Sequence, residues 1–76
     1  MSRLPRVSGR ETVRALERAG FVVSRQRGSH VRLFRAGVGQ VIVPLHGNRD
    51  IPAGTLRNIL RQANLSVDEF IELLEG

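Results

Sequence analysis

The sequence contains no cysteine and only two histidines among its 76 residues. Disulfides, thiolate metal sites and cysteine nucleophiles are therefore excluded, and two histidines alone do not predict a dedicated zinc site. Long apolar runs are also missing, because residues 1–7 lack the continuous apolar core of a signal peptide and no segment is long enough to span a bilayer. We expect no metal, no cofactor, no membrane association and a cytoplasmic location.

Lysine is absent as well, so all twelve basic residues are arginines, and the formal net charge is +5. The charge is unevenly distributed along the chain. All the arginines lie at or before Arg61, together with three carboxylates, whereas the residues from Gln62 onward carry four carboxylates and no base. A basic body is typical of a protein that binds a polyanion, either nucleic acid or an acidic protein. The alternative is a solvated surface whose arginines reflect coding bias.

What remains is the composition of an ordinary globular protein, with 41% hydrophobic and 25% charged residues. A chain of 76 residues suffices for one compact domain and is too short for two. We therefore expect a single domain over residues 1–76.

Local signals predict the first helix. The segment 8–11 has the form of a capping box, which indicates a helix that ends near Ala19, with Gly20 as its left-handed stop. Helical spacing predicts that its buried stripe contains Val13, Leu16 and Ala19.

Two further helices follow near the end of the chain. Pro52 suits the first turn of a helix that runs to about Ala63 and directs Arg57 and Arg61 outward. Its inward residues are predicted to be Leu56, Ile59, Leu60 and Ala63. Asn64 is a plausible left-handed cap, and residues 66–69 form a second capping box. The last helix then has the apolar residues Phe70, Leu73 and Leu74 on one side.

Between the helices lie three short segments rich in β-branched or aromatic residues, at positions 21–27, 30–35 and 40–44. Alternation in the second segment places Val31 and Leu33 on a face that we expect helices to cover, and His30, Arg32 and Phe34 on the other face. The predicted fold is α+β, with a three-stranded antiparallel sheet and helices on one face, in the order α-β-β-β-α-α. This is the layout of the double-stranded-RNA-binding fold, and it does not assign a function by itself.

His30 is the candidate catalytic residue. It follows Gly28 and Ser29 at the predicted hairpin turn, on the face that carries Arg32. Imidazole exchanges protons near neutral pH, and arginine grips phosphate with two donors, so the combination suggests cleavage of a phosphodiester. Turn geometry alone explains Gly28, and Ser29 is a candidate phosphate donor. A lone histidine is also commonly an ordinary turn or surface residue.

Two groups of arginines are candidate phosphate contacts. The group that flanks the histidine turn contains Arg25, Arg27 and Arg32. The second group combines the loop before the second long helix with one face of that helix, and it contains Arg49, Arg57 and Arg61. A solvated helix face is the alternative for the second group.

His46 lies in the same loop as Arg49. It is a candidate second proton-transfer group or a contact to RNA, and the alternative is a loop residue that stacks over the sheet. The sequence does not fix its distance from His30.

In order and spacing, these segments resemble the HicA (YcfA-like) family, the toxin half of a bacterial and archaeal toxin–antitoxin pair. The match covers nearly the whole chain and rests on residues 8–21, 28–33, 43–46, 51–63 and 65–70. The Gly-Ser-His triplet alone would be a weak signal, whereas the ordered set is specific. Asn64 stands where many members have glycine, which is a conservative change at a helix cap.

The resemblance implies the toxin of a type II system, a small metal-independent ribonuclease that cleaves mRNA. It also implies a cognate HicB-type antitoxin that covers the active histidine, and it carries the family's catalytic position onto His30. The alternative is a non-catalytic RNA-binding module of the same fold, although such modules usually place lysines at the start of the last helix. A third reading is a copy that has lost activity and mainly binds the antitoxin. Phe34 then has three candidate uses, which are stacking a base, packing in the core and contacting the antitoxin.

Overall fold

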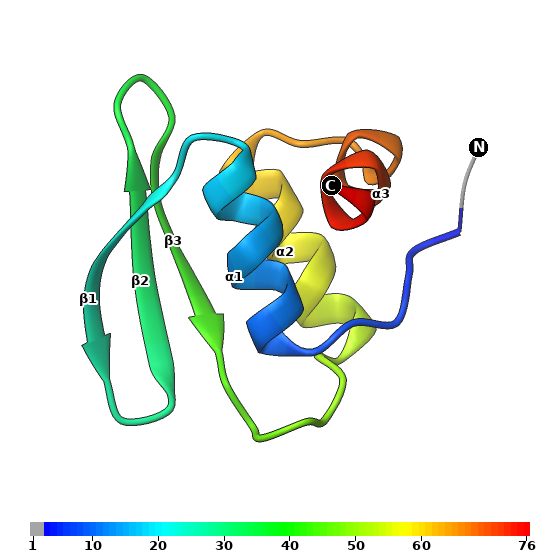
Figure 1. Ribbon diagram of the computed structural model, residues 1–76, viewed down its shortest axis with the longest axis horizontal. Coiled ribbons are helices and arrows are strands. Elements are labelled where there is room, and N and C mark those ends of the chain that lie inside the picture. Colours follow the sequence, from blue (N-terminus) through cyan, green and yellow to red (C-terminus); the bar gives the residue numbers. More distant parts are fainter. Residues whose placement is uncertain (1–2) are drawn as a thin grey trace.

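The computed structural model describes residues 3–76, which form three helices and one three-stranded sheet (Figure 1). Along the chain the elements are α1 (Gly9–Arg18), β1 (Val22–Arg27), β2 (His30–Arg35), β3 (Gly39–Pro44), α2 (Ala53–Ala63) and α3 (Val67–Glu75). The strands are antiparallel in the order β1-β2-β3, and the helices gather on one side of the sheet. The predicted α+β class and element order are confirmed. Within the described part of the chain, no helix has the length and apolar character needed to cross a bilayer.

Both predicted capping boxes are present. At α1 the Ser8 hydroxyl accepts from the Glu11 N–H at 3.2 Å, and the Glu11 carboxylate accepts from the Ser8 N–H at 2.9 Å. Ser66 and Glu69 make the same pair of bonds at α3, at 3.0 and 2.8 Å. Because these side chains satisfy N–H groups that a helix start otherwise leaves unpaired, the helix boundaries follow closely from the sequence.

The buried stripe of α1 differs from the prediction. Val13 and Ala19 are only partly buried, whereas Thr12 and Ala15 are fully buried beside Leu16. Thr12 can lie in the interior because its hydroxyl donates to the Ser8 carbonyl at 2.9 Å, which satisfies the polar group. The buried face of α1 is therefore rotated toward Thr12 relative to the predicted one.

Three boundaries shift by one residue. Pro52 is the N-cap of α2 and not its first residue, Phe21 is buried just before β1, and β3 begins at Gly39. The predicted C-cap at Asn64 is confirmed, with a left-handed φ of 59°.

The core lies between the sheet and the helices. From the sheet it receives Val31, Leu33, Val41 and Val43, and from α2 it receives Leu56, Ile59, Leu60 and Ala63. Leu16 of α1 and Phe70 of α3 complete the contact between the layers. The predictions for the inward residues of β2 and α2 are confirmed, and His30, Arg32 and Phe34 are left on the opposite, exposed side of β2.

The edge strand β1 lies outside this core, since all six of its residues are exposed. Its pairing with β2 is irregular: Val23 lies opposite Leu33, but Arg25 lies opposite Arg32, which leaves Ser24 as an extra residue in a β-bulge. The Ser24 hydroxyl donates to the Arg32 carbonyl at 3.2 Å and closes the bulge.

The start of α1 packs against the end of β3. A Cβ built on Gly9 would collide with the Pro44 carbonyl oxygen, so only glycine fits there without movement of the backbone. The loop after β3 is joined to neighbouring segments at both ends. The Leu45 N–H donates to the Ser29 carbonyl, and the Ile51 N–H donates to the Val7 carbonyl at 2.8 Å.

Candidate functional site

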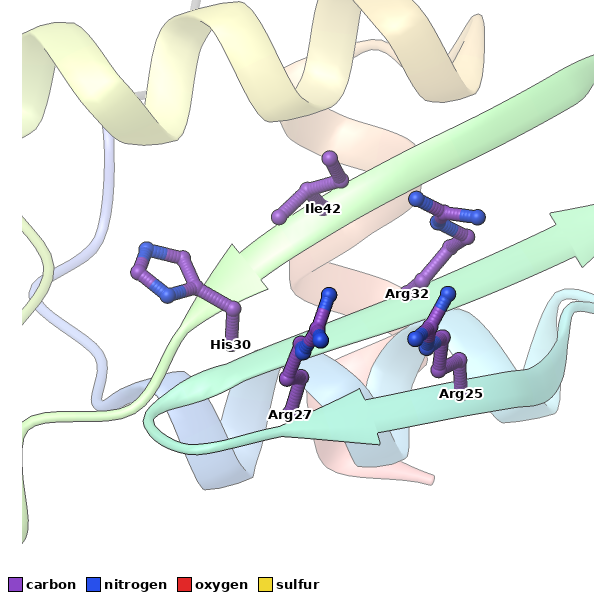
Figure 2. Close-up of a pocket in the computed structure, with 5 residues that line it drawn as sticks. All are labelled: Arg25, Arg27, His30, Arg32 and Ile42. Carbon is purple, nitrogen blue, oxygen red and sulfur yellow. The ribbon is translucent and has the colours of Figure 1, made fainter.

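The face of the sheet opposite the helices carries an open pocket of about 270 Å³. Figure 2 shows its lining, which comes from all three strands and consists of Arg25, Arg27, His30, Arg32 and Ile42. In this view the three arginine side chains rise from β1 and β2 on the same side as the imidazole. The pocket therefore combines one imidazole with three guanidinium groups.

Cross-strand register explains why these residues meet. Arg27 lies opposite His30, Arg25 lies opposite Arg32, and Arg32 lies opposite Ile42. Directly opposed residues share a face of the sheet, so each pair adds a side chain to the His30 face. The strands thus position the pocket through their backbone pairing.

The bulge at Ser24 determines the face of two of the arginines. In an unbroken strand, alternation would place Arg25 and Arg27 on the same face as Val23, which is the face that packs toward the helices. The extra residue reverses the alternation after Val23, so both arginines point into the pocket, and Val22 remains opposite Phe34.

His30 is held at the start of β2 by a tight turn. Gly28 has a φ of 57°, a left-handed conformation that glycine adopts without strain, and this lets β1 and β2 join through Gly28 and Ser29. On the other side His30 is paired with Pro44 of β3. The imidazole is thus exposed to solvent on a backbone that is fixed on both sides.

The pocket lies in a strongly cationic environment. The sheet and its turns, from residue 22 to residue 44, contain four arginines and no aspartate or glutamate. Along the chain the nearest carboxylates are Glu17 and Asp50. Such a surface attracts anions, and guanidinium groups suit the oxygens of a phosphate. Within residues 3–76, no three acidic or imidazole side chains gather in a group of the kind that holds a metal ion.

The structure brings together only part of the predicted site. Arg25, Arg27 and Arg32 join His30, whereas Ser29 and His46 are exposed in the adjoining turn and loop without lining the pocket. His46 directly follows Leu45, whose N–H is bonded to the Ser29 carbonyl, so the backbones of the two histidine-bearing segments are adjacent.

The second arginine group lies apart from this pocket. Arg57 lines a groove with Arg3, Arg6 and Asp50, between the N-terminal segment and the start of α2. Arg61 lines a neighbouring groove that Arg57 also borders, and Arg49 is exposed in the loop before α2. Neither groove shares a lining residue with the His30 pocket.

Ile42 is the residue of the pocket that the sequence did not indicate. It stands in the apolar run from Val41 to Val43, where three successive aliphatic residues hide the alternation of faces. Pairing with Arg32 would have identified it, but that register is set by tertiary structure.

A comparison with protein families supplies the remaining observation. A family model described as HicA toxin of bacterial toxin-antitoxin matches residues 9–65. The chain belongs to the HicA toxin family. The matched segment of this HicA chain begins at the first residue of α1 and extends past α2, so it includes the whole sheet and the pocket. A search of curated proteins found no match. As a HicA toxin, the protein is the toxin component of a toxin–antitoxin system and has a cognate antitoxin as its partner.

Proposed function

We propose that this HicA toxin is a ribonuclease that cleaves mRNA, with His30 as its proton-transfer residue. The observation that supports the proposal is the single pocket that His30 shares with Arg25, Arg27 and Arg32. Phosphodiester cleavage needs a proton-transfer group and cations that bind the phosphate, and an imidazole beside three guanidinium groups supplies the residue types for both roles.

The chemistry that fits these groups is transesterification within the RNA. The ribose 2′-oxygen attacks phosphorus as it loses its proton, and the bond from phosphorus to the 5′-oxygen breaks as that oxygen gains a proton. The products are a 2′,3′-cyclic phosphate and a 5′-hydroxyl. His30 serves as the base for the first proton or as the acid for the second, and the arginines stabilise the charge that develops on the phosphoryl oxygens. This scheme has no step that requires a metal ion.

His46 is the proposed partner in proton transfer or a contact to the RNA. The hydrogen bond between Leu45 and Ser29 supports this assignment, because it ties the start of the His46 loop to the turn that precedes His30. Ser29 is exposed at the same turn and is proposed as a donor to a phosphate.

For the second arginine group we propose contacts to more distant phosphates of the same RNA. Arg49, Arg57 and Arg61 are exposed outside the pocket, which suits an extended polyanion better than a single phosphate.

The first prediction concerns His30. We expect the purified toxin, freed of antitoxin, to cleave a single-stranded mRNA in EDTA, and His30→Ala and His30→Gln to lose roughly a hundredfold or more of that activity. The same RNA with a 2′-deoxy nucleotide at the cleavage site should resist cutting at that site. Gel analysis of the products measures both effects, and circular dichroism establishes that each variant is folded.

Arg14→Ala is the matched control, because Arg14 is an exposed arginine on α1, on the helical side of the sheet. It should cleave like the parent. Equal cleavage by the parent and by folded His30→Ala would contradict the catalytic role of His30. Binding of RNA without cleavage by the parent would instead favour a non-catalytic RNA-binding module.

A further inference from the structure

The three phenylalanines of the chain differ sharply in exposure. Phe21 and Phe70 are buried, with 2% and 0% of their surface accessible, whereas Phe34 is 49% exposed. Packing in the core, one of the uses considered for Phe34, is therefore excluded. Its ring stands on the face of β2 that carries His30 and Arg32, because residues 30, 32 and 34 alternate with the buried Val31 and Leu33.

Apolar side chains lie on part of the surface around this ring, and Gln40 lies opposite it on β3. Val22, which lies opposite Phe34 on β1, is 67% exposed, and Ile42 of the His30 pocket is 42% exposed. Ile42 lies opposite Arg32, so it adjoins the arginines and is a diagonal neighbour of Phe34 across β2 and β3. We call Val22, Phe34 and Ile42 the apolar platform.

The charge beside the platform indicates what covers it. Arg25 and Arg32 stand on the same face, and the three strands contribute no carboxylate. Proteins that bind single-stranded nucleic acid combine cations along the backbone with an exposed ring on which a base stacks. His30 and Phe34 are four residues apart on one strand, a separation of about 13 Å. A ligand cut at His30 would thus reach Phe34 with a neighbouring nucleotide.

We propose that Phe34 stacks an unpaired base of the RNA substrate, next to the nucleotide cut at His30, with Val22 supporting the same base. This inference rests on the proposed ribonuclease function and adds a selectivity to it. A base in a duplex is already stacked and paired, so the apolar platform selects RNA whose bases are unpaired near the cleavage site.

The absence of tryptophan and tyrosine from the chain allows a direct test. Phe34→Trp, made together with His30→Ala so that the RNA stays intact, places the only tryptophan on the platform. We expect a single-stranded oligoribonucleotide to quench its fluorescence, and the same strand in a duplex, or with an abasic nucleotide at the stacking position, to quench it much less. Glu72→Trp in the same background is the control, since Glu72 is exposed on α3, on the helical side of the sheet.

Kinetics provide a second readout in chains that keep His30. Phe34→Ala should raise the KM for single-stranded RNA roughly ten- to hundredfold, with a smaller effect on kcat, and Phe34→Tyr should restore it. Phe34→Leu keeps an apolar side chain without the aromatic face and should not restore it.

Two results would overturn the proposal. One is a Phe34→Trp chain whose fluorescence changes equally with single-stranded, duplex and abasic RNA. Another is a Phe34→Ala chain that cleaves like the parent but resists inhibition by the antitoxin, which would assign the platform to the protein partner. Failure of the proposed function gives a different result. If the parent cuts no RNA, the ribonuclease proposal is wrong, but the fluorescence test can still be made, and quenching by single strands would still support stacking.

Discussion

Gly9 shows how a single residue of α1 holds the strand that supports the candidate site. Its Cα faces the Pro44 carbonyl, and Pro44 is the residue paired with His30. A methyl group at this position would meet backbone oxygen and the Leu45 side chain. The end of β3, including Pro44 opposite His30, would then have to move.

We predict that Gly9→Ala destabilises the protein by about 1–3 kcal/mol, as expected for overpacking in a filled interior. Gly54→Ala is the matched control, because a Cβ on Gly54, in the first turn of α2, meets nothing within 4 Å. Replacing a helical glycine by alanine without a clash should stabilise by up to about 1 kcal/mol. Denaturant unfolding measures the change in the free energy of unfolding for each variant, and the two changes should have opposite signs. An equal stabilisation by both substitutions would show that the close approach at Gly9 has no energetic cost.

The face of His30 was predictable from the sequence, and the faces of Arg25 and Arg27 were not. On β2 the buried Val31 and Leu33 alternate regularly with exposed residues, so local periodicity suffices. On β1 every residue is exposed, and the sequence has no apolar pattern from which to read the bulge at Ser24. The arginines were expected near His30 because they are near in sequence, whereas the bulge is the physical reason that they share its face.

At the scale of elements, the helices were the most predictable part of the fold. Their starts are encoded locally, by serine and glutamate three positions apart at α1 and α3, and α2 ends at Asn64 in a left-handed conformation. The error in the stripe of α1 comes from a polar residue whose hydroxyl is satisfied at the start of the same helix. Thr12 is buried because its hydroxyl finds the Ser8 carbonyl, and a pattern of apolar residues does not include such a polar member.

The capping box of α3 predicts a pH effect. Hydrogen bonds from the backbone N–H and the side chain of Ser66 lower the pKa of Glu69 below its ordinary value of 4.5. Because the pKa is lower in the folded state, the stabilisation is present above the ordinary pKa and is lost as pH falls through the folded one. We expect Glu69→Gln to melt below the parent at neutral pH and to approach it in acid.

Thermal unfolding followed by circular dichroism, from about pH 6 to about pH 3, measures this convergence. Ser66→Ala removes the hydroxyl partner, so the effect of Glu69→Gln should be smaller in a chain that already carries Ser66→Ala. A gap between Glu69→Gln and the parent that stays constant over the whole range would contradict the predicted coupling.

At the scale of the whole molecule, charge is separated between the sheet and the last helix. The sheet carries arginines and no carboxylates, and α3 carries four carboxylates and no base. The C-terminal end of α3 is nevertheless tied to the basic body, because the Arg18 guanidinium donates to the Leu73 carbonyl at 2.7 Å. The sequence predicted the uneven charge, whereas the separation of Arg57 and Arg61 from the His30 pocket depends on how α2 packs.

This separation predicts how RNA binding responds to salt. Affinity should fall with a log–log slope of about −0.7 for each phosphate of a single strand that is neutralised, so three contacts at the pocket would give a slope of about −2. Replacing Arg25, Arg27 and Arg32 by alanine should flatten the slope by about that amount. Titrations with a labelled oligoribonucleotide at several salt concentrations measure the slope, in the His30→Ala background so that the RNA stays intact. A salt-independent affinity would contradict the phosphate contacts.

The position of β1 outside the core separates the stability of the site from that of the fold. This strand supplies two of the three arginines of the pocket, and none of its residues belongs to the buried core. Its detachment from β2 would therefore expose little apolar surface and leave the helices and the other two strands packed. The pocket can thus be lost through a local opening of low free energy, at temperatures where the molecule as a whole is still folded, and any ligand that bridges β1 and β2 would suppress that opening.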